Sequence, residues 1–166
     1  IPAEMKSVAA ALGKTVLREV EEEEFFAKMG ELRKKCGDRA VLRAAHFFDE
    51  NNRVEKAAEA LKSGDIDTFL AAINASGNSS YKFLQNVYAN KNPEEQGVAV
   101  GLYTAERVLG GKGASRVHGG GFAGTIQAFV PNELLDEFIK AEDAVFGEGS
   151  CHKLFIRPVG GTEINV

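Results

Sequence analysis

Hydrophobic residues recur at helical spacing along most of the first 110 positions. In residues 39–62, Val41, Ala44, Ala45 and Phe48 share one helical face, which predicts a single long helix. The same kind of stripe predicts further helices over residues 1–12, 21–29 and 66–73, and another that starts near Pro93. A shorter stretch, residues 14–20, lacks this period and fits a short strand or a bridge.

Polar residues mark the breaks between these helices. A Ser-Gly-Asp break ends the long helix, and Asp65 is placed to cap the next helix at its N-terminus. Residues 74–80 are polar and are expected to form a flexible connection. The hydroxyl and amide groups of Ser76–Ser80 either cap the start of a following helix or hydrogen-bond a sugar hydroxyl or a phosphate. Ser79 and Ser80 are therefore candidate ligand contacts.

After residue 111 the hydrophobic period changes from helical to alternating. Residues 114–119 and 122–130 are strand-like, with Ile126, Ala128 and Val130 on one face of the second strand. Because only a very short turn joins the two strands, they must pair antiparallel.

A helix and a third strand are expected after this hairpin. Residues 132–146 carry an apolar helical stripe, and residues 151–159 alternate again. This order predicts an α+β fold, in which an antiparallel sheet is packed with helices and preceded by a helical segment. The length fits one domain over residues 1–166, with a helical part over residues 1–110 and a sheet-rich part over residues 111–166.

A cluster of glycines joins the two strands of the expected hairpin. Gly119, Gly120, Gly121 and Gly124 fill four of six consecutive positions. Glycine loses much conformational freedom on folding, so the cluster serves either a turn that needs positive φ or the close approach of backbone N–H groups to an anion such as a phosphate. The turn is not a P-loop, since no Gly-Lys-Ser/Thr follows, and it leads into a strand, unlike a dinucleotide-binding loop.

Polar side chains near the glycine cluster are further candidates. Arg116 and His118 flank the turn, and each either reaches a phosphate or points outward from its strand. His46 and His152 have no acidic or cysteine neighbour at catalytic or metal spacing, and the Asp49–Asn52 run does not match a calcium loop. The residues by themselves therefore indicate neither a catalytic group nor a metal site.

Composition narrows the class of protein. Hydrophobic residues make up 44% and charged residues 27% of the chain, which suits a globular fold with a real core. The net charge of −4, without a clustered basic surface, argues against a nucleic-acid partner. No apolar run has the length of a membrane helix and no signal peptide is visible, so no membrane partner is expected. Cys36 and Cys151 are expected to be free thiols in a reducing cytoplasm.

Residues 116–130, RVHGGGFAGTIQAFV, resemble the glycine-rich third motif of the galactokinases, sugar kinases of the GHMP family. The likeness extends over nearly the whole chain, and its other segments are residues 39–54, Gly64-Asp65, residues 76–84 and residues 110–115. Two positions depart from the family pattern, because Asn78 stands where a histidine is usual and Ala123 where a glycine is usual.

The resemblance implies both an activity and a place in a larger enzyme. Galactokinases transfer the γ-phosphate of ATP to the C1 hydroxyl of galactose, with Mg²⁺, in a site between two lobes. This chain resembles their C-terminal lobe, an antiparallel sheet backed by helices with the ferredoxin-like arrangement of GHMP kinases. The glycine-rich turn of that lobe helps shape the substrate and phosphate pocket, which here implies Gly119, Gly120, Gly121, Phe122 and Gly124.

Two galactokinase signatures are not found in this chain, the sugar-recognition motif GRxNxIGEH and the phosphate loop GxGLSSSA. They and the catalytic aspartate are expected in an N-terminal lobe, which would bind most of the ATP and Mg²⁺ and is the expected partner of this chain. The isolated chain is therefore expected to be inactive. Two alternatives stay open: a non-catalytic regulator that binds sugar and ATP with the same fold, and another small-molecule kinase of the GHMP family.

Overall fold

Helices account for most of the chain. The structure, a computed structural model, describes residues 1–122, 124–156 and 159–160. In chain order the helices are α1 (Pro2–Ala11), α2 (Glu22–Ala27), α3 (Met29–Cys36), α4 (Asp38–Ser63), α5 (Ile66–Ser79), α6 (Gly97–Leu109) and α7 (Leu135–Phe146). Two 3-10 turns (Leu17–Glu19 and Asn132–Leu134) and one π-helical turn (Ser80–Leu84) connect them.

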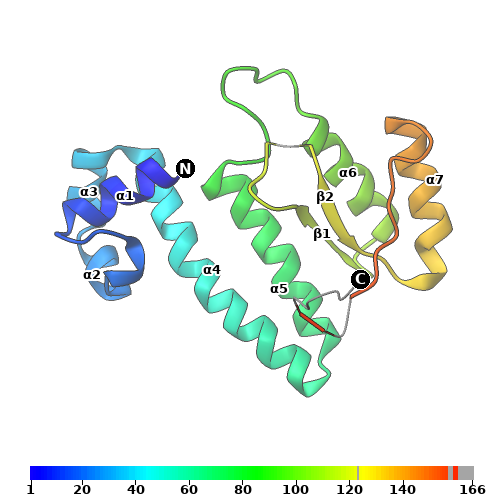
Figure 1. Ribbon diagram of the computed structural model, residues 1–166, viewed down its shortest axis with the longest axis horizontal. Helices are drawn as coiled ribbons and strands as arrows, with labels where there is room; N and C mark the ends of the chain where they lie inside the picture. Colours follow the sequence, from blue (N-terminus) through cyan, green and yellow to red (C-terminus); the bar gives the residue numbers. More distant parts are fainter. Residues whose placement is uncertain (123, 157–158, 161–166) are drawn as a thin grey trace, which may run out of the picture.

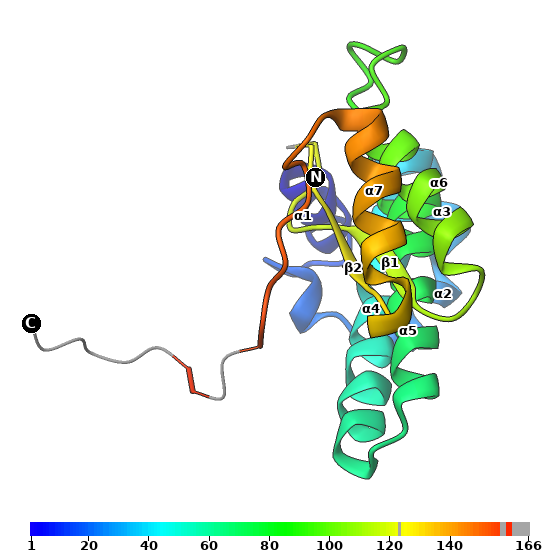
Figure 2. The same ribbon diagram turned by 90° about the vertical axis from the view of Figure 1, so that its right-hand side faces the viewer.

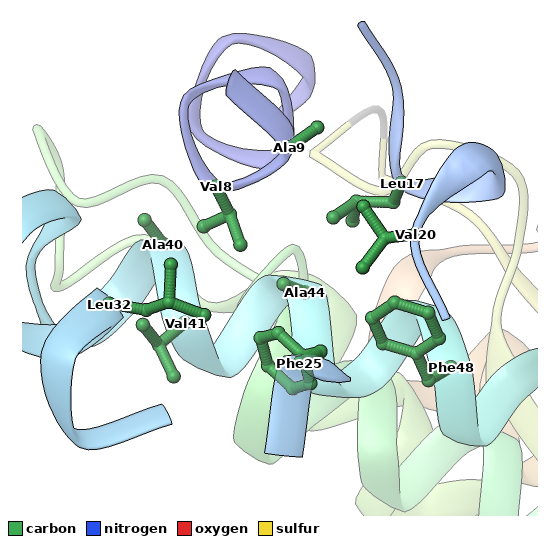
Figure 3. Close-up of a cluster of buried hydrophobic side chains, with 10 residues drawn as sticks. All are labelled: Val8, Ala9, Leu17, Val20, Phe25, Leu32, Ala40, Val41, Ala44 and Phe48. Atoms are coloured by element: carbon green, nitrogen blue, oxygen red, sulfur yellow. The ribbon is translucent and has the colours of Figure 1, made fainter. Parts of the chain in front are cut away.

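The first four helices share one hydrophobic core (Figure 3). Val8 of α1 and Phe25 of α2 are fully buried and belong to the same cluster as Ala44 and Phe48 of α4. The ring centroids of Phe25 and Phe48 lie 5.0 Å apart. Burial of a side chain of this size stabilises the fold by about 1.5–3 kcal/mol relative to leaving it exposed. The cluster therefore fixes α1 firmly against α4.

The second half of the chain is built on a β-hairpin. Strands β1 (Ala114–Val117) and β2 (Ile126–Phe129) pair antiparallel. Helices α5 and α6 pack against β1, α4 packs against α5, and α7 packs against α6 (Figures 1 and 2). Phe69 of α5 meets Phe129 of β2 edge to face, with ring centroids 5.2 Å apart. The predicted fold class, an antiparallel sheet packed with helices and preceded by a helical segment, is confirmed.

The structure departs from the local predictions at three places. Of the two alternatives for residues 14–20, the short strand is wrong, because this connection contains the 3-10 turn that buries Leu17 in the core. Residues 74–79 are not a flexible connection but the end of α5, because Ser76 and Ser79 are buried against α4. Helix α6 begins at Gly97 rather than near Pro93, because hydrogen-bonded turns occupy the preceding residues.

The third predicted strand, residues 151–159, was also wrong. Arg157 and Pro158 lie outside the described residues, and the rest of the segment forms no strand, so the described sheet has two strands. Its apolar side chains are almost fully exposed: Leu154, Phe155 and Ile156, at 84, 83 and 90%. Among the described residues, these alternating apolar side chains have no core surface to pack against.

Other features of the fold bear on the sequence predictions. The expected division at residue 110 coincides with the end of α6, although the domain division itself stays a prediction and residues 161–166 lie outside the described part. In the described part of the chain, no helix combines the length and the apolar character needed to cross a bilayer. Cys36 and Cys151 are both unpaired and half-buried.

Candidate functional site

The glycine-rich turn, residues 118–125, joins β1 to β2. The His118 N–H donates to the Thr125 carbonyl oxygen at 3.1 Å and so closes the turn. Left-handed backbone conformations occur at four of its described residues: Gly119, Gly121, Phe122 and Gly124, with φ of 60, 73, 59 and 82°. Glycine adopts these angles without steric cost, whereas a phenylalanine adopts them at a cost. The turn is thus a defined bend that requires most of its glycines.

The turn is docked on Asn86, which follows the π-helical turn at the end of α5. The Phe122 N–H donates to the Asn86 carbonyl oxygen at 2.9 Å. A Cβ atom on Gly121 would lie 2.1 Å from that oxygen, so only glycine fits there. Asn86 is 1% exposed, and Gln85 beside it has a φ of 57°. The two non-glycine residues with left-handed backbone, Gln85 and Phe122, thus lie at this contact, one bonded to Asn86 and the other next to it in the chain, and such strain clusters at functional sites.

A cavity of about 470 Å³ lies where the turn faces α4 and the start of α1. Gly119, Gly120 and Phe122 line it from the turn, and His46 and Glu50 line it from α4. Apolar side chains complete much of the wall: Ile1, Pro2, Met5, Phe47 and Leu84. The N–H groups of Gly119 and Gly120 make no hydrogen bond to any residue that the structure describes. Two free backbone donors in a glycine-rich wall suit an anionic oxygen such as that of a phosphate.

A polar network beside this cavity links α4, α5 and β1. The Glu50 carboxylate accepts hydrogen bonds from the Ser76 hydroxyl and from Arg53 Nε, the latter at 2.8 Å. Arg116 Nη1 of β1 lies 3.5 Å from the same carboxylate. Arg53 Nη2 also donates to the Ser79 hydroxyl oxygen at 2.9 Å. Because each side chain has a partner on another element, the network holds the three elements in fixed positions.

The network sets the charge of the two titratable side chains on the cavity wall, His46 and Glu50. Burial tends to raise the pKa of Glu50, but the hydrogen bonds from Ser76 and Arg53 and the charges of Arg53 and Arg116 outweigh it and lower that pKa. Burial lowers the pKa of His46, and the positive charges of Arg53 and Arg116 lower it further against the opposing carboxylate of Glu50. At neutral pH the cavity wall therefore presents an ionised Glu50 and a neutral His46.

Comparisons with known proteins assign the family. The chain is 31% identical to a galactokinase of Glaesserella parasuis over 137 residues, which are 82% of this chain and 34% of that protein. A galactokinase of Thermotoga petrophila is 34% identical over 74% of this chain and 31% of its own length. The crystal structure of Lactococcus lactis galactokinase complexed with galactose matches the fold with a TM-score of 0.65, at 28% identity, covering 87% of this chain and 37% of that one.

The chain belongs to the galactokinase family. It spans about a third of the length of the curated relatives that it matches, 34% in the case of the Glaesserella parasuis galactokinase. None of the protein-family models matches the chain. The family assignment therefore depends on individual relatives and on the shared fold.

The residues implied by the galactokinase turn motif take different places. Gly119, Gly120 and Phe122 line the cavity, whereas Gly121 packs against Asn86 behind them. Gly124 is exposed and lies outside the cavity lining. Their role as contacts for a galactokinase substrate stays a prediction. The position of Ala123 lies outside the described residues.

None of the four polar candidates, Arg116, His118, Ser79 and Ser80, lines this cavity. Arg116 is engaged with Glu50, and His118 is exposed and is not part of the cavity lining. Ser79 is buried in the polar network, and the Ser80 hydroxyl is fully buried without a partner among the described side chains. Both serines lie where α5 ends rather than at a helix start, so the predicted capping role at a helix start was wrong.

Sequence reasoning missed three residues of the site: His46, Glu50 and Asn86. A usable signal existed for the first two, because His46, Glu50 and Arg53 are spaced by four and three positions and so share one face of α4. Asn86 carried no such signal, since its importance comes from its contact with a turn that is distant in sequence.

The cavity suits a ligand oxygen better than a metal ion. The described residues hold no group of three or more His, Cys, Asp or Glu side chains placed to bind a metal. Glu50 is already engaged by Arg53 and Ser76. The Mg²⁺ ion that accompanies ATP therefore does not fit among these side chains, whereas the amide donors of Gly119 and Gly120 fit a phosphate or sugar oxygen.

Proposed function

We propose that this chain is the C-terminal lobe of a galactokinase, an enzyme that phosphorylates galactose with ATP. Its glycine-rich turn and α4 then form one wall of the substrate site. The observation that carries this proposal is the position of Gly119 and Gly120 in the cavity wall, where their N–H groups bond to no residue that the structure describes. Similarity to galactokinases, including one complexed with galactose, supports the choice of substrate.

The chemistry of phosphoryl transfer fits a supporting lobe of this kind. The γ-phosphate passes from ATP to the C1 hydroxyl, and catalysis depends mainly on positioning and on stabilising the charge of the phosphoryl oxygens. The amides of Gly119 and Gly120 donate to such an oxygen, and Phe122 and Phe47 help to exclude water from one side. The sugar-recognition motif, the phosphate loop, the catalytic aspartate and the magnesium ligands belong to the N-terminal lobe in this proposal.

A coupled assay of ADP release tests the proposed function in the full-length protein. We expect turnover of galactose, with little or none of N-acetylgalactosamine or mevalonate. The 166-residue chain alone should release no ADP above background. If the full-length protein binds galactose and ATP without turnover, a sugar-sensing regulator replaces the enzyme, and if it prefers mevalonate, it is a different GHMP kinase.

A further inference from the structure

His46 lies where the polar network meets the cavity. Its side chain comes from the middle of α4, is 6% exposed and lines the cavity with Gly119 and Gly120 of the turn. Its Nδ1 atom lies 2.9 Å from the Ser79 hydroxyl oxygen. The other ring nitrogen, Nε2, has no hydrogen-bond partner in the part of the chain that the structure describes. The imidazole is thus held at one nitrogen and open at the other.

The second partner of Ser79 fixes the position of the ring proton. Arg53 Nη2 donates to the Ser79 oxygen at 2.9 Å, and a guanidinium can only donate. The Ser79 oxygen could accept a second hydrogen bond, but the buried hydroxyl has no acceptor other than His46 Nδ1 among the described residues, so its single hydrogen goes to that nitrogen. A neutral imidazole that accepts at Nδ1 carries its proton on Nε2. The chain of bonds from Arg53 through Ser79 therefore selects one tautomer.

The surroundings of His46 favour the neutral ring. Burial is the main cause of its lowered pKa; Arg53 on α4 and Arg116 on β1 lower it as well, while Glu50 and Asp49 on α4 act in the opposite direction. The ring therefore presents an uncharged N–H donor rather than a cation.

We propose that His46 is a ligand-binding residue of this cavity, whose Nε2–H donates a hydrogen bond to an acceptor oxygen of the substrate, and that Arg53 and Ser79 position it. The acceptor oxygen belongs either to a phosphate group or to a sugar hydroxyl, which share this chemistry. The proposal deepens the proposed function and rests on it for the identity of the ligands. The tautomer itself depends only on contacts within this chain.

NMR of the imidazole nitrogens tests the tautomer in the full-length protein. We expect the His46 signals, assigned by their loss in His46→Gln, to report the Nε2–H form at neutral pH. Ser79→Ala should remove this preference and leave a mixture of tautomers. An Nδ1–H ring or an imidazolium at neutral pH in the wild type would overturn the proposal, whether or not the protein proves to be a galactokinase.

Steady-state kinetics tests the contact with the ligand. His46→Leu removes the donor, and a lost hydrogen bond of this kind corresponds to a rise in KM of about tenfold. A rise confined to ATP identifies a phosphate acceptor, and a rise confined to galactose identifies a sugar hydroxyl. His46→Gln can still place an N–H donor and should recover most of the loss, which a purely structural role would not produce.

A matched control separates these outcomes from general damage. His152→Leu makes the same change at an exposed histidine outside the cavity and should leave both KM values unchanged. If His46→Leu does not fold, His46→Gln and Ser79→Ala provide the comparison. Unchanged KM values for both substrates in a folded His46→Leu protein would overturn the ligand contact, whereas a wild type without turnover would count against the proposed function alone.

Discussion

The glycines of the turn differ in what each position demands. Gly121 combines a φ of 73° with a backbone contact that leaves no room for a Cβ atom. Gly120, beside it, has open space at the Cβ position and a φ outside the left-handed region. The cluster of glycines in the sequence predicts a turn that needs glycine. The sequence does not show which of these glycines is least replaceable, because that depends on a contact with Asn86, which is distant along the chain.

Gly121→Ala should destabilise the protein. The added methyl group would collide with the Asn86 carbonyl oxygen and would sit on a left-handed backbone, and together these effects cost about 1–3 kcal/mol. Urea unfolding of the variant measures the loss. Gly120→Ala is the control and should stay within about 0.5 kcal/mol of the wild type. Equal stability of the two variants would contradict the docking of the turn on Asn86.

Glu50→Gln should weaken the fold in a pH-dependent way. The folded pKa of Glu50 lies below its ordinary value of 4.5, so its ionised form stabilises the protein above that pH, and this contribution is lost as the pH falls through the lower folded value. At pH 7 the variant removes the negative charge that faces Arg53 and Arg116 and should be less stable by about 1–3 kcal/mol.

The destabilisation caused by Glu50→Gln should become smaller at acid pH. The difference in unfolding free energy between Glu50→Gln and the wild type should shrink as the pH falls below 4.5 and through the lower pKa of the folded state, because the wild-type carboxyl then becomes protonated too. Urea titrations over this range follow the difference. A gap that stays constant or widens at acid pH would show that the Glu50 charge does not stabilise the fold.

The sequence pattern predicts the extent of α4 and the start of α5, but not the end of α5. Helix α4 spans Asp38–Ser63, close to the predicted residues 39–62. Asp65 caps α5 as predicted, since its carboxylate accepts from the Thr68 N–H at 3.0 Å. The end of α5 was interpreted as a loop because its residues are polar, but Glu50, Arg53 and His46 satisfy those hydroxyls inside the fold. Hydrophobic periodicity does not reveal a polar interface of this kind.

The crossing of α5 and β1 depends on Gly77. A Cβ atom there would lie 3.0 Å from both Arg116 Cβ and the Ser115 carbonyl oxygen. Gly77→Ala should therefore push β1 away from α5 and destabilise the protein by about 1–3 kcal/mol. Gly30→Ala is a matched change in α3, where no atom lies near the Cβ position, and it should be neutral or stabilising by up to about 1 kcal/mol.

Chemical unfolding of Gly77→Ala and Gly30→Ala in the same buffer measures the change in unfolding free energy for both variants. We expect the free energy of unfolding of Gly77→Ala to be lower than that of Gly30→Ala. If Gly77→Ala were as stable as Gly30→Ala, the close approach of β1 to α5 would be wrong, and with it the route by which Arg116 reaches Glu50.

In the chain as a whole, the site lies where two separately packed parts meet. The cluster of α1 to α4 supplies His46 and Glu50, and the hairpin carried by α5 and α6 supplies the turn. The sequence predicts the α+β class and the antiparallel hairpin, because these follow from local periodicity. It could not predict the cavity, since Met5, His46 and Gly119 meet only through the packing of α4 against α5.

Galactose-dependent ADP release by the full-length protein, with wild type, Gly121→Ala and Gly30→Ala assayed together, tests most directly whether this turn forms part of a galactokinase site. We expect turnover by the wild type and by Gly30→Ala, and a loss of about tenfold or more in kcat/KM for a folded Gly121→Ala protein, since a displaced wall costs at least that much. No turnover by the wild type, or full activity in a folded Gly121→Ala protein, would contradict the claim that this turn builds a galactokinase site.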